Sequence, residues 1–533
     1  MIPQVERSTD TDDKHAGVIR LLRLAQTGNR EQALLLADEQ LRVSESPGML
    51  YARAVALHSI GDHAGAAGAA ERILALTAGD GVAGEMAGWR SIALSFRAWK
   101  HIVLSEVQKQ AVDLDSILRA LARAEALLSD DVPDGFVLAT AHTCLGNAYN
   151  DLRLYELARP HYDAAFAAAT TRTDVIVDRA VSSQVNLATM HLNWAMELHR
   201  IGDSHGAREK SVIAARHAAT AQEYATTNDA QSWGAHAGLL FACADSAGGD
   251  DEVVVARIRA GLKAMEGRGA RESRPFALPF LARALDRAGQ HSEALAVAEQ
   301  AISALTDDAT WQTAAPAFHT HATLLGALGS DSARAALAYG DQLAETLWRQ
   351  RLRTLHNARS VQVLERVTRE RDRVQVLANT DALTGVGNRR AFDVRMAELG
   401  TSATDEVALI VVDVDLLKAV NDADGHEAGD RVLKAVAVAL TSQVRAGDLV
   451  ARVGGDEFVA VLEDMDRAAA RRGGRTHGRG CLGSARLDRD RERGGRHGPS
   501  LRGRTEPVAR GRQGDVCGQA KQQGRDDRIS TCR

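Results

Sequence analysis

Gly454-Gly455-Asp456-Glu457-Phe458 is the stretch of this chain that says most about its fold. An apolar run stands on either side of it. Apolar runs separated by a short Gly-rich turn predict a β-hairpin, here with acidic groups at its tip. Glycine adopts backbone angles that other residues avoid, and without a side chain it lets a phosphate approach the main chain. An acidic surface turn is the simpler interpretation, but it does not account for the residues upstream.

Upstream, a continuous apolar run at 407–412 ends in Asp413-Val414-Asp415. Its length and its β-branched residues predict a buried strand, and the acids at its end would lie at the rim of a sheet. Mg²⁺ prefers oxygen ligands and few protein carboxylates, which leaves positions for the phosphates of a substrate. Strand and hairpin together therefore predict a metal-nucleotide site, whereas one acid alone would indicate a solvated strand end.

Two further motifs make the chain resemble the GGDEF diguanylate cyclase family. Residues 381–390 (DALTGVGNRR) are similar to the family signature D-x-L-T-x-L-x-N-R-R. Residues 413–430 (DVDLLKAVNDADGHEAGD) are similar to its motif D-x-D-x-F-K-x-x-N-D-x-x-G-H-x-x-G-D, with Leu417 in place of Phe. The resemblance covers residues 380 to 465, and its motifs are specific because they occur in the family order.

The resemblance implies how the metal and the phosphates are handled. Mg²⁺ (or Mn²⁺) would be held by the carboxylates of Asp413 and Asp456 and by the carbonyl of Val414. Asp456, with Glu457 beside it, would help to deprotonate the ribose 3′-hydroxyl that attacks. Lys418 would neutralise charge on the phosphates during transfer.

The resemblance also implies two recognition sites. Asn421 and Asp430 would read the guanine edge of GTP, with His426 near the same substrate, although a lone His in a Gly-rich loop is more often structural. Arg445 and Asp448 stand where many family members carry an R-x-x-D site for inhibition by the product. A surface ion pair in a turn is the simpler interpretation of those two residues.

The family fold is an α/β (α+β) sandwich around a mainly antiparallel sheet, similar to polymerase palms and nucleotidyl cyclases. The resemblance implies a homodimer in which each protomer binds one GTP. Each 3′-hydroxyl would attack the partner's α-phosphate, release pyrophosphate and form cyclic di-GMP. Activity would therefore depend on the geometry of the dimer.

The segment 467–533 differs in composition from the rest of the chain. It is rich in Arg, Gly and Gln, has no Phe, Trp or Tyr, and shows neither a helical nor a strand period. This composition predicts a disordered basic tail, which could bind nucleic acid or an acidic surface. The GGDEF domain, at 380–466, would then be C-terminally incomplete.

A reading-frame slip in the gene explains this tail better than a natural basic segment does. Codons for 487–494 read one base later permit Leu-Thr-Val-Thr-Val-Ser-Val-Gly, which resembles a later strand of the family. The same shift over 514–521 permits the family's late helix motif A-M-Y-x-A-K. A sequencing error that leaves the real protein intact is the remaining alternative. On the frame-slip interpretation this copy is inactive or impaired, and it could instead be a catalytically dead scaffold or cyclic di-GMP-binding protein.

Residues 1–340 are rich in Ala, Leu and Arg, with apolar residues at helical spacing. Turns that begin at Gly28, Gly61, Gly202 and Gly289 share a form, with Ala five residues after each glycine. They resemble tetratricopeptide repeats, in which Gly ends one helix and small residues let the next pack closely. We expect an all-α solenoid of about six to eight degenerate repeats that binds a protein or peptide. An ordinary helical bundle is the alternative.

A charged helix at 341–379 is expected to link the two parts. Val363, Val367, Val374 and Leu377 give a partial a/d seam, interrupted by Glu370. The helix is either a solvated linker or the element that pairs two protomers.

The composition limits the remaining functions. The formal net charge of −5 gives no general signal for nucleic-acid binding. Of the five cysteines only Cys144 and Cys243 precede the tail, so no disulfide framework is expected. The chain shows no signal peptide and no apolar run of membrane-spanning length. We therefore expect a cytoplasmic protein with no membrane partner.

Overall fold

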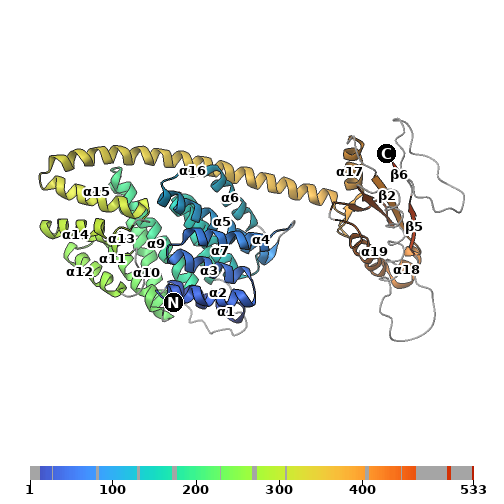
Figure 1. The fold of residues 1–533 in the computed structure, drawn as a ribbon, viewed down its shortest axis with the longest axis horizontal. Coiled ribbons are helices and arrows are strands. Elements are labelled where there is room, and N and C mark those ends of the chain that lie inside the picture. The colour runs from blue at the N-terminus through green and yellow to red at the C-terminus, as the bar shows by residue number, and fades with distance from the viewer. Residues whose placement is uncertain are drawn as a thin grey trace. The chain divides into compact units, whose positions relative to one another are not determined.

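The computed structural model describes residues 12–26, 28–79, 83–128, 132–170, 177–228, 230–266, 273–306, 309–401, 407–445, 447–463, 501–505 and 531–532. Internal contacts divide the chain into two compact units, Met1–Val367 and Thr368–Arg533 (Figure 1). None of the helices in the described ranges is both long enough and apolar enough to cross a membrane.

Helices make up the first unit. In chain order they are α1 (Asp12–Gln26), α2 (Arg30–Val43), α3 (Pro47–Ser59), α4 (His63–Leu76), α5 (Gly84–Gln108), α6 (Leu114–Leu127), α7 (Gly135–Asp151), α8 (Tyr155–Thr170), α9 (Val177–Arg200), α10 (Ser204–Thr227), α11 (Gln231–Asp245), α12 (Asp251–Met265), α13 (Ser273–Arg287), α14 (His291–Ser303), α15 (Trp311–Ala327) and α16 (Asp331–Asn379). Neighbours in sequence pack against each other from α1 to α15, so the unit is built as a stack of helices (Figure 1).

The turns between these helices have the geometry expected from their glycines. Gly28, Gly61, Gly202 and Gly289 have φ values of 102°, 88°, 82° and 79°, a region that side chains disfavour. Each therefore ends one helix so that the next can fold back. The alanine five residues later is fully buried after three of the four glycines. The region is helical and its turns recur as predicted; that the repeats are of the tetratricopeptide type stays a prediction.

The turn between α7 and α8 departs from this pattern. Arg153 holds the left-handed position, with φ at 61°, where those four turns have glycine. A non-glycine residue there costs roughly 1–2 kcal/mol. Close packing of the two helices instead depends on Gly146, because a Cβ at that position would collide with the ring of Tyr162.

The linker helix begins earlier than expected, at Asp331 rather than at residue 341, and α16 runs unbroken to Asn379. Part of it belongs to the first unit, where Leu355 and Ala358 are buried with residues of α6, α7 and α8. The side chain of Arg351 in α16 pairs with Glu156 in α8. The a/d seam lies beyond these contacts, with Val363 and Val367 each 60% exposed.

A mixed sheet organises the second unit. Its elements are β1 (Gly387–Asn388), α17 (Arg389–Thr401), β2 (Val407–Val414), α18 (Leu417–Asp424), α19 (His426–Thr441), β3 (Leu449–Arg452), β4 (Glu457–Leu462), β5 (Leu501–Thr505) and β6 (Thr531–Cys532). The strand order is β1-β3-β4-β2-β5, and β6 also pairs with β2. Only β1 and β3 run parallel among these strands. The predicted hairpin is β3–β4.

The predicted buried strand, β2, has only one buried face in the described residues. Ala408, Ile410, Val412 and Val414 are buried, while the residues between them are partly or fully exposed. The buried set packs with α19 and with β4, including Leu433 and Phe458. Alternation of this kind is typical of an antiparallel sheet with a helix on one face. The prediction that the apolar run at 407–412 is buried throughout is therefore wrong for one face of β2.

Two short segments of the tail form strands, which differs from the disorder expected for 467–533. Residues 501–505 pair with 410–414, and 531–532 pair with 407–408. The edge of β2 opposite β4 offers free main-chain donors and acceptors, so an extended segment of almost any composition can pair with it. The rest of the tail lies outside the described residues, and its predicted disorder stays a prediction.

Candidate functional site

The pairing of β2 with β4 brings the predicted acids together. Asp413 lies directly opposite Glu457 in the antiparallel register. The Val414 amide donates to the Asp456 carbonyl at 3.0 Å, which joins the end of β2 to the hairpin tip. Burial and then the negative charges of Asp456, Asp415 and Glu457 raise the pKa of Asp413 above its usual value. Such mutual repulsion is relieved when a cation binds between carboxylates.

These residues fit a hard divalent cation because their donors are all oxygens. In the described part of the chain, three acidic or histidine ligand atoms come within 4.8 Å of one another at His15, Glu85 and Asp134 but not among the acids of β2 and β4. Mg²⁺ needs few protein carboxylates, so a site with two of them would leave coordination positions for the phosphate oxygens of a substrate.

The two glycines at the hairpin tip matter because they lack a side chain, not because their backbone angles are unusual. Neither Gly454 nor Gly455 has a positive φ, so the expectation of a side-chain-forbidden backbone is wrong for both. A Cβ on Gly454 would lie 2.7 Å from a carboxylate oxygen of Glu457. A Cβ on Gly455 would meet nothing within 4 Å, which leaves the main chain at the tip accessible.

Arg452 holds the hairpin tip, a role that the motifs did not indicate. Its guanidinium donates to the Gly455 carbonyl, at 2.6 Å from Nη2, and to the carboxylate of Asp381, at 3.3 Å. Burial opposes ionisation of Asp381, but hydrogen bonds from Thr384 and the charge of Arg452 outweigh it and lower the pKa of that carboxyl. Asp381 of the DALTGVGNRR signature therefore helps to fix the hairpin tip, through its contact with Arg452.

The remaining residues that the motifs predicted to contact the substrate lie on α18 and α19. The chain turns sharply into α18 at Leu416, which has a φ of 63°. The Asn421 side chain lies over Gly429, where a Cβ would collide with its Oδ1, and Asp430 is the next residue along α19. Lys418 and His426 are exposed, and in the described residues no hydrogen bond or ion pair joins them to the acids.

At the proposed product site, Asp448 bonds main-chain amides and does not form an ion pair with the Arg445 side chain. The Asp448 carboxylate accepts from the Arg445 amide at 2.9 Å and from the Glu463 amide at 3.3 Å. Asp448 thus fixes a turn between α19 and β3. The Arg445 side chain is exposed, and within the described ranges its guanidinium has no ion-pair partner.

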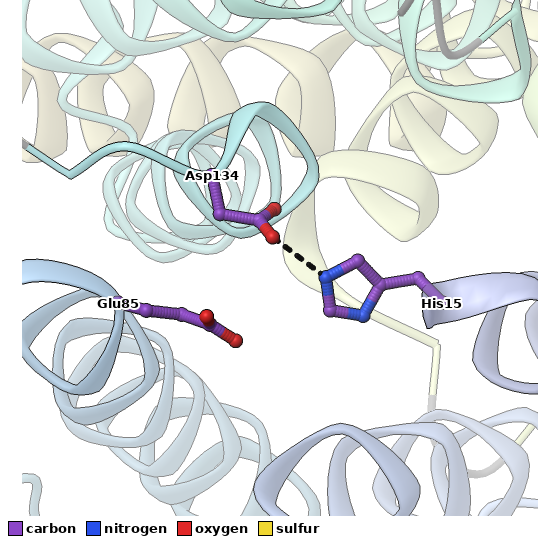
Figure 2. Close-up of side chains that lie close together, drawn as sticks. All are labelled: His15, Glu85 and Asp134. Atoms are coloured by element: carbon purple, nitrogen blue, oxygen red, sulfur yellow. Dashed lines mark hydrogen bonds and ion pairs between the residues drawn. The ribbon is translucent and has the colours of Figure 1, made fainter. Parts of the chain in front are cut away.

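His15, Glu85 and Asp134, which sequence analysis did not single out, meet in the first unit (Figure 2). His15 Nε2 lies 2.8 Å from an oxygen of Asp134. The Lys14 ammonium pairs with Glu85 and lies 3.4 Å from Asp134, so it already supplies a cation to both acids. Asp134 also caps α7 by accepting from the Val137 amide. We therefore interpret the cluster as an ion-pair network that joins α1, α5 and α7.

Comparison with known proteins identifies the class of the second unit. Residues 378–478 match the family model for the diguanylate cyclase GGDEF domain. The match covers about a fifth of the chain. This segment is a GGDEF domain, as its motifs predicted.

Individual relatives resemble the same segment. The response regulator PleD of Caulobacter vibrioides (strain NA1000 / CB15N) is 44% identical over 99 residues, which are 18% of this chain and 22% of PleD. The probable diguanylate cyclase DgcE of Escherichia coli (strain K12) is 40% identical over 121 residues, 22% of this chain and 11% of DgcE. The cyclic di-GMP phosphodiesterase PdeR of the same strain is 36% identical over 102 residues, 19% and 15% of the two chains. The chain spans less than a quarter of each of these relatives.

Solved structures resemble the chain only locally. The coiled coil and GGDEF domain of DgcB from Caulobacter crescentus, in complex with c-di-GMP, is 26% identical with a TM-score of 0.25, over 28% of this chain and 80% of that one. The diguanylate cyclase SiaD from Pseudomonas aeruginosa, in complex with its activator SiaC, is 24% identical with a TM-score of 0.22, over 44% and 89%. Scores this low do not establish a common architecture.

Proposed function

We propose that the chain derives from a diguanylate cyclase that condenses two GTP into cyclic di-GMP and pyrophosphate. The observation that carries this proposal is the register of β2 and β4, which sets Asp413 opposite Glu457 and bonds Val414 to Asp456. Acids on two strands at one sheet edge suit a metal-nucleotide substrate.

Each residue has one task in this proposal. Asp413, Asp456 and the Val414 carbonyl hold Mg²⁺ or Mn²⁺, which supplies charge stabilisation at the phosphates. Asp456 and Glu457 accept the proton of the 3′-hydroxyl. Lys418, exposed at the start of α18, reaches outward to the phosphates.

Guanine is read on the neighbouring helices. Asn421 and Asp430 hydrogen-bond the guanine edge, and the packing of Asn421 on Gly429 supports their joint use. His426, at the start of α19, lies within the same motif and contacts the same substrate.

Two copies are required because each 3′-hydroxyl attacks the α-phosphate held by the other. The a/d seam of α16 is the surface that we assign to pairing. Val363, Val367, Val374 and Leu377 are all more than half exposed, as an unpartnered coiled-coil seam would be.

The helical repeats would regulate the cyclase by binding a protein or peptide. Support comes from α16, since a single helix packs on the repeats near Leu355 and continues to the first GGDEF signature. A partner that alters this packing would alter the register of the seam.

The tail is the reason to expect impaired activity in this copy. We propose that a frame slip replaced the later strands and helix of the GGDEF domain with the basic segment. Strands β5 and β6 pair with the edge of β2, but the sequence of the tail does not match the family's late motif, which carries a phosphate-binding Lys and Arg.

Product analysis tests this function. A frame-restored protein should convert GTP to cyclic di-GMP with Mg²⁺, and Asp456→Asn should lower turnover by more than about 100-fold through loss of the metal ligand and base. The chain itself should form little or no product. A frame-restored protein that leaves GTP unchanged would refute the cyclase proposal, and robust turnover by the chain itself would refute the claim that the tail impairs it.

The alternative function is a catalytically dead scaffold that binds cyclic di-GMP. The Arg445 guanidinium is exposed beside the fixed Asp448 and has no ion-pair partner among the described residues, which favours this candidate because an arginine fork suits phosphate and the guanine edge. Calorimetry with cyclic di-GMP should show about 10-fold weaker binding for Arg445→Ala, and unchanged binding for Arg431→Ala, an exposed arginine on α19. Equal binding of cyclic di-GMP by both variants would show that Arg445 does not form a product site.

A further inference from the structure

We propose that Gln362 is a polar lock that holds α16 on the repeat unit and fixes the direction in which the a/d seam faces. Contacts of α16 with the repeat unit include those of residues 351, 355, 358, 362 and 365. This alternation of four and three residues places them on one face of the helix. The role of the seam in pairing rests on the proposed function, whereas the lock is a contact within the first unit.

The middle of this face of α16 is apolar. Leu355 and Ala358 are 6% and 2% exposed, and they pack against side chains of α6, α7 and α8. Apolar burial holds the helix on the repeat unit, but the hydrophobic effect is not directional. Polar contacts on either side of Leu355 and Ala358 therefore add the directional part of the contact.

The polar contacts at the two ends of this face differ in strength. Arg351, at the first end, is 3% exposed, pairs with Glu156 and donates from Nε to the Arg153 carbonyl at 2.5 Å. At the second end, Glu365 lies 3.5 Å from the largely exposed guanidinium of Arg123, and exposed ion pairs contribute little. The second end therefore depends mainly on the hydrogen bonds of Gln362.

Gln362 meets a polar cluster that is built from three helices of the repeat unit. Its Nε2 donates to Oε1 of Glu125 in α6, at 2.7 Å, and to the Tyr149 hydroxyl in α7, at 3.1 Å. The same Glu125 oxygen lies 2.8 Å from Nε2 of His161 in α8. Tyr149 is 1% exposed, and its ring stacks on the ring of His161. The position of Gln362 is thus fixed by α6, α7 and α8 together.

Loss of the Gln362 amide would take two hydrogen bonds from this cluster. The bond to Glu125 is charge-assisted, and such bonds are stronger than bonds between neutral groups. The Tyr149 residue is buried, so water does not readily replace the donor that its hydroxyl would lose. The second end of the contact should therefore open more often when Gln362 is replaced by an apolar residue.

The seam stays accessible while Gln362 is bound to the repeat unit. Val363 follows Gln362 directly, and successive residues of an α-helix are turned by about 100°. Val363 and Val367 are each 60% exposed although Gln362 makes both of its hydrogen bonds. The repeat unit therefore does not cover the seam but determines which way it faces. A partner that moves α6 relative to α7 would break the cluster and free the rotation of α16.

Hydrogen exchange on the full chain tests the lock. Gln362→Leu keeps a side chain of similar size but removes both donors. We expect peptides from 351–367 to exchange about 10- to 100-fold faster, as the loss of one or two hydrogen bonds to buried groups requires. Gln350→Leu, which changes an exposed residue of the same helix, is the control and should exchange as the original chain does. Unchanged exchange at 351–367 in Gln362→Leu would overturn the proposal.

A second variant separates the lock from a general loss of stability. Glu125→Gln replaces the charged acceptor with a neutral one, so it should speed exchange at 351–367 less than Gln362→Leu does. The double variant should loosen α16 by less than the sum of the single effects, because both remove the same contact. Additive effects, or equally faster exchange in peptides from α11, would overturn the proposal and leave Gln362 a general stabilising residue. Exchange needs no cyclase activity, so either result leaves the cyclase proposal unaffected.

Discussion

Asp413, at the end of β2, has surroundings that differ from those of an ordinary surface acid. Burial and three neighbouring carboxylates raise its pKa. A proton competes with a metal for the same oxygens, so metal affinity should fall as pH falls through this raised pKa. The loss should therefore begin at a higher pH than for an unperturbed aspartate.

Manganese titrations of the chain between pH 4 and pH 7 measure this effect. We expect the apparent Mn²⁺ affinity to drop about 10-fold per pH unit below the raised pKa, as competition with one proton requires. A flat profile over that range would show that Asp413 is not a ligand. Protein unfolding, followed by circular dichroism at each pH, is the control.

At the level of residues, the sequence predicted the acidic residues but not the residues that hold the hairpin and the turn in place. Asp413 and Asp456 were identifiable because strand ends and Gly-rich turns leave a local signal. Arg452 was not, since its role depends on Asp381, which is distant in sequence and meets it only in the fold. The same holds for Asp448, whose carboxylate fixes a turn through the amide of Glu463.

The packing of α18 on α19 depends on one missing side chain. A Cβ on Gly429 would collide with Oδ1 of Asn421, although alanine is otherwise better than glycine in a helix by about 1 kcal/mol. Gly429→Ala should destabilise α19 by about 1–3 kcal/mol through this overlap. The double variant Asn421→Ala/Gly429→Ala should recover at least about 1 kcal/mol of that loss.

Native-state hydrogen exchange of peptides from 426–441 reports the opening free energy of α19. Gly400→Ala is the matched control, because a Cβ there meets nothing within 4 Å. Additive effects of Asn421→Ala and Gly429→Ala would show that the two residues do not touch, and would weaken the proposal that Asn421 and Asp430 read guanine together.

Helix α9 contains a histidine that must stay neutral. His191 is fully buried, neither ring nitrogen has a hydrogen-bond partner in the described residues, and its ring stacks on His217 and Trp194. Burial, and then the charge of His217, lowers the pKa of His191 to about 3. The unfolded chain, with an ordinary pKa of about 6.5, therefore binds the proton first. The contribution of His191 is complete above pH 6.5 and is lost as pH falls toward 3.

Urea unfolding at two pH values measures this loss. Between pH 6.5 and pH 5 the repeat unit should lose up to about 2 kcal/mol through His191, and His191→Phe should remove that part. Tryptophan fluorescence follows this unit selectively, because all six tryptophans precede residue 368. His101→Gln, an exposed histidine on α5, should keep the original dependence. An unchanged pH dependence in His191→Phe would show that His191 is not the group responsible.

Helices and turns with strong local sequence signals were predictable, but the residues at which some of them begin were not. The glycines at 28, 61, 202 and 289 marked helix ends because positive φ favours glycine. The turn at Arg153 gave no such signal, since its backbone angle is held by the ion pair with Glu197. The start of α16 at Asp331 was missed although it has a local signal, since Gly329 has a φ of 96° and the Ser330 hydroxyl accepts from the Ala333 amide.

For the whole molecule, the tail at 467–533 is where the sequence departs from the motifs of the GGDEF family. If a frame slip produced it, the gene read one base later should be open from about codon 475 onward. That frame should encode residues similar to the family's Ser-x-Gly strand and its late helix motif. Resequencing the codons for 466–475 checks this, and an early stop in the shifted frame would restore the interpretation as a natural basic tail.

Manganese binding by the chain tests most directly whether the end of β2 and the β4 hairpin form one divalent-cation site. Calorimetry with MnCl₂ in the presence of GTP needs no turnover, so it applies even if the tail abolishes catalysis. We predict that Asp413→Asn weakens Mn²⁺ binding by at least about 10-fold, through loss of one carboxylate ligand. Asp393→Asn, which removes an exposed acid of α17, should leave binding unchanged. Equal Mn²⁺ affinity in Asp413→Asn and the original chain would contradict the metal site.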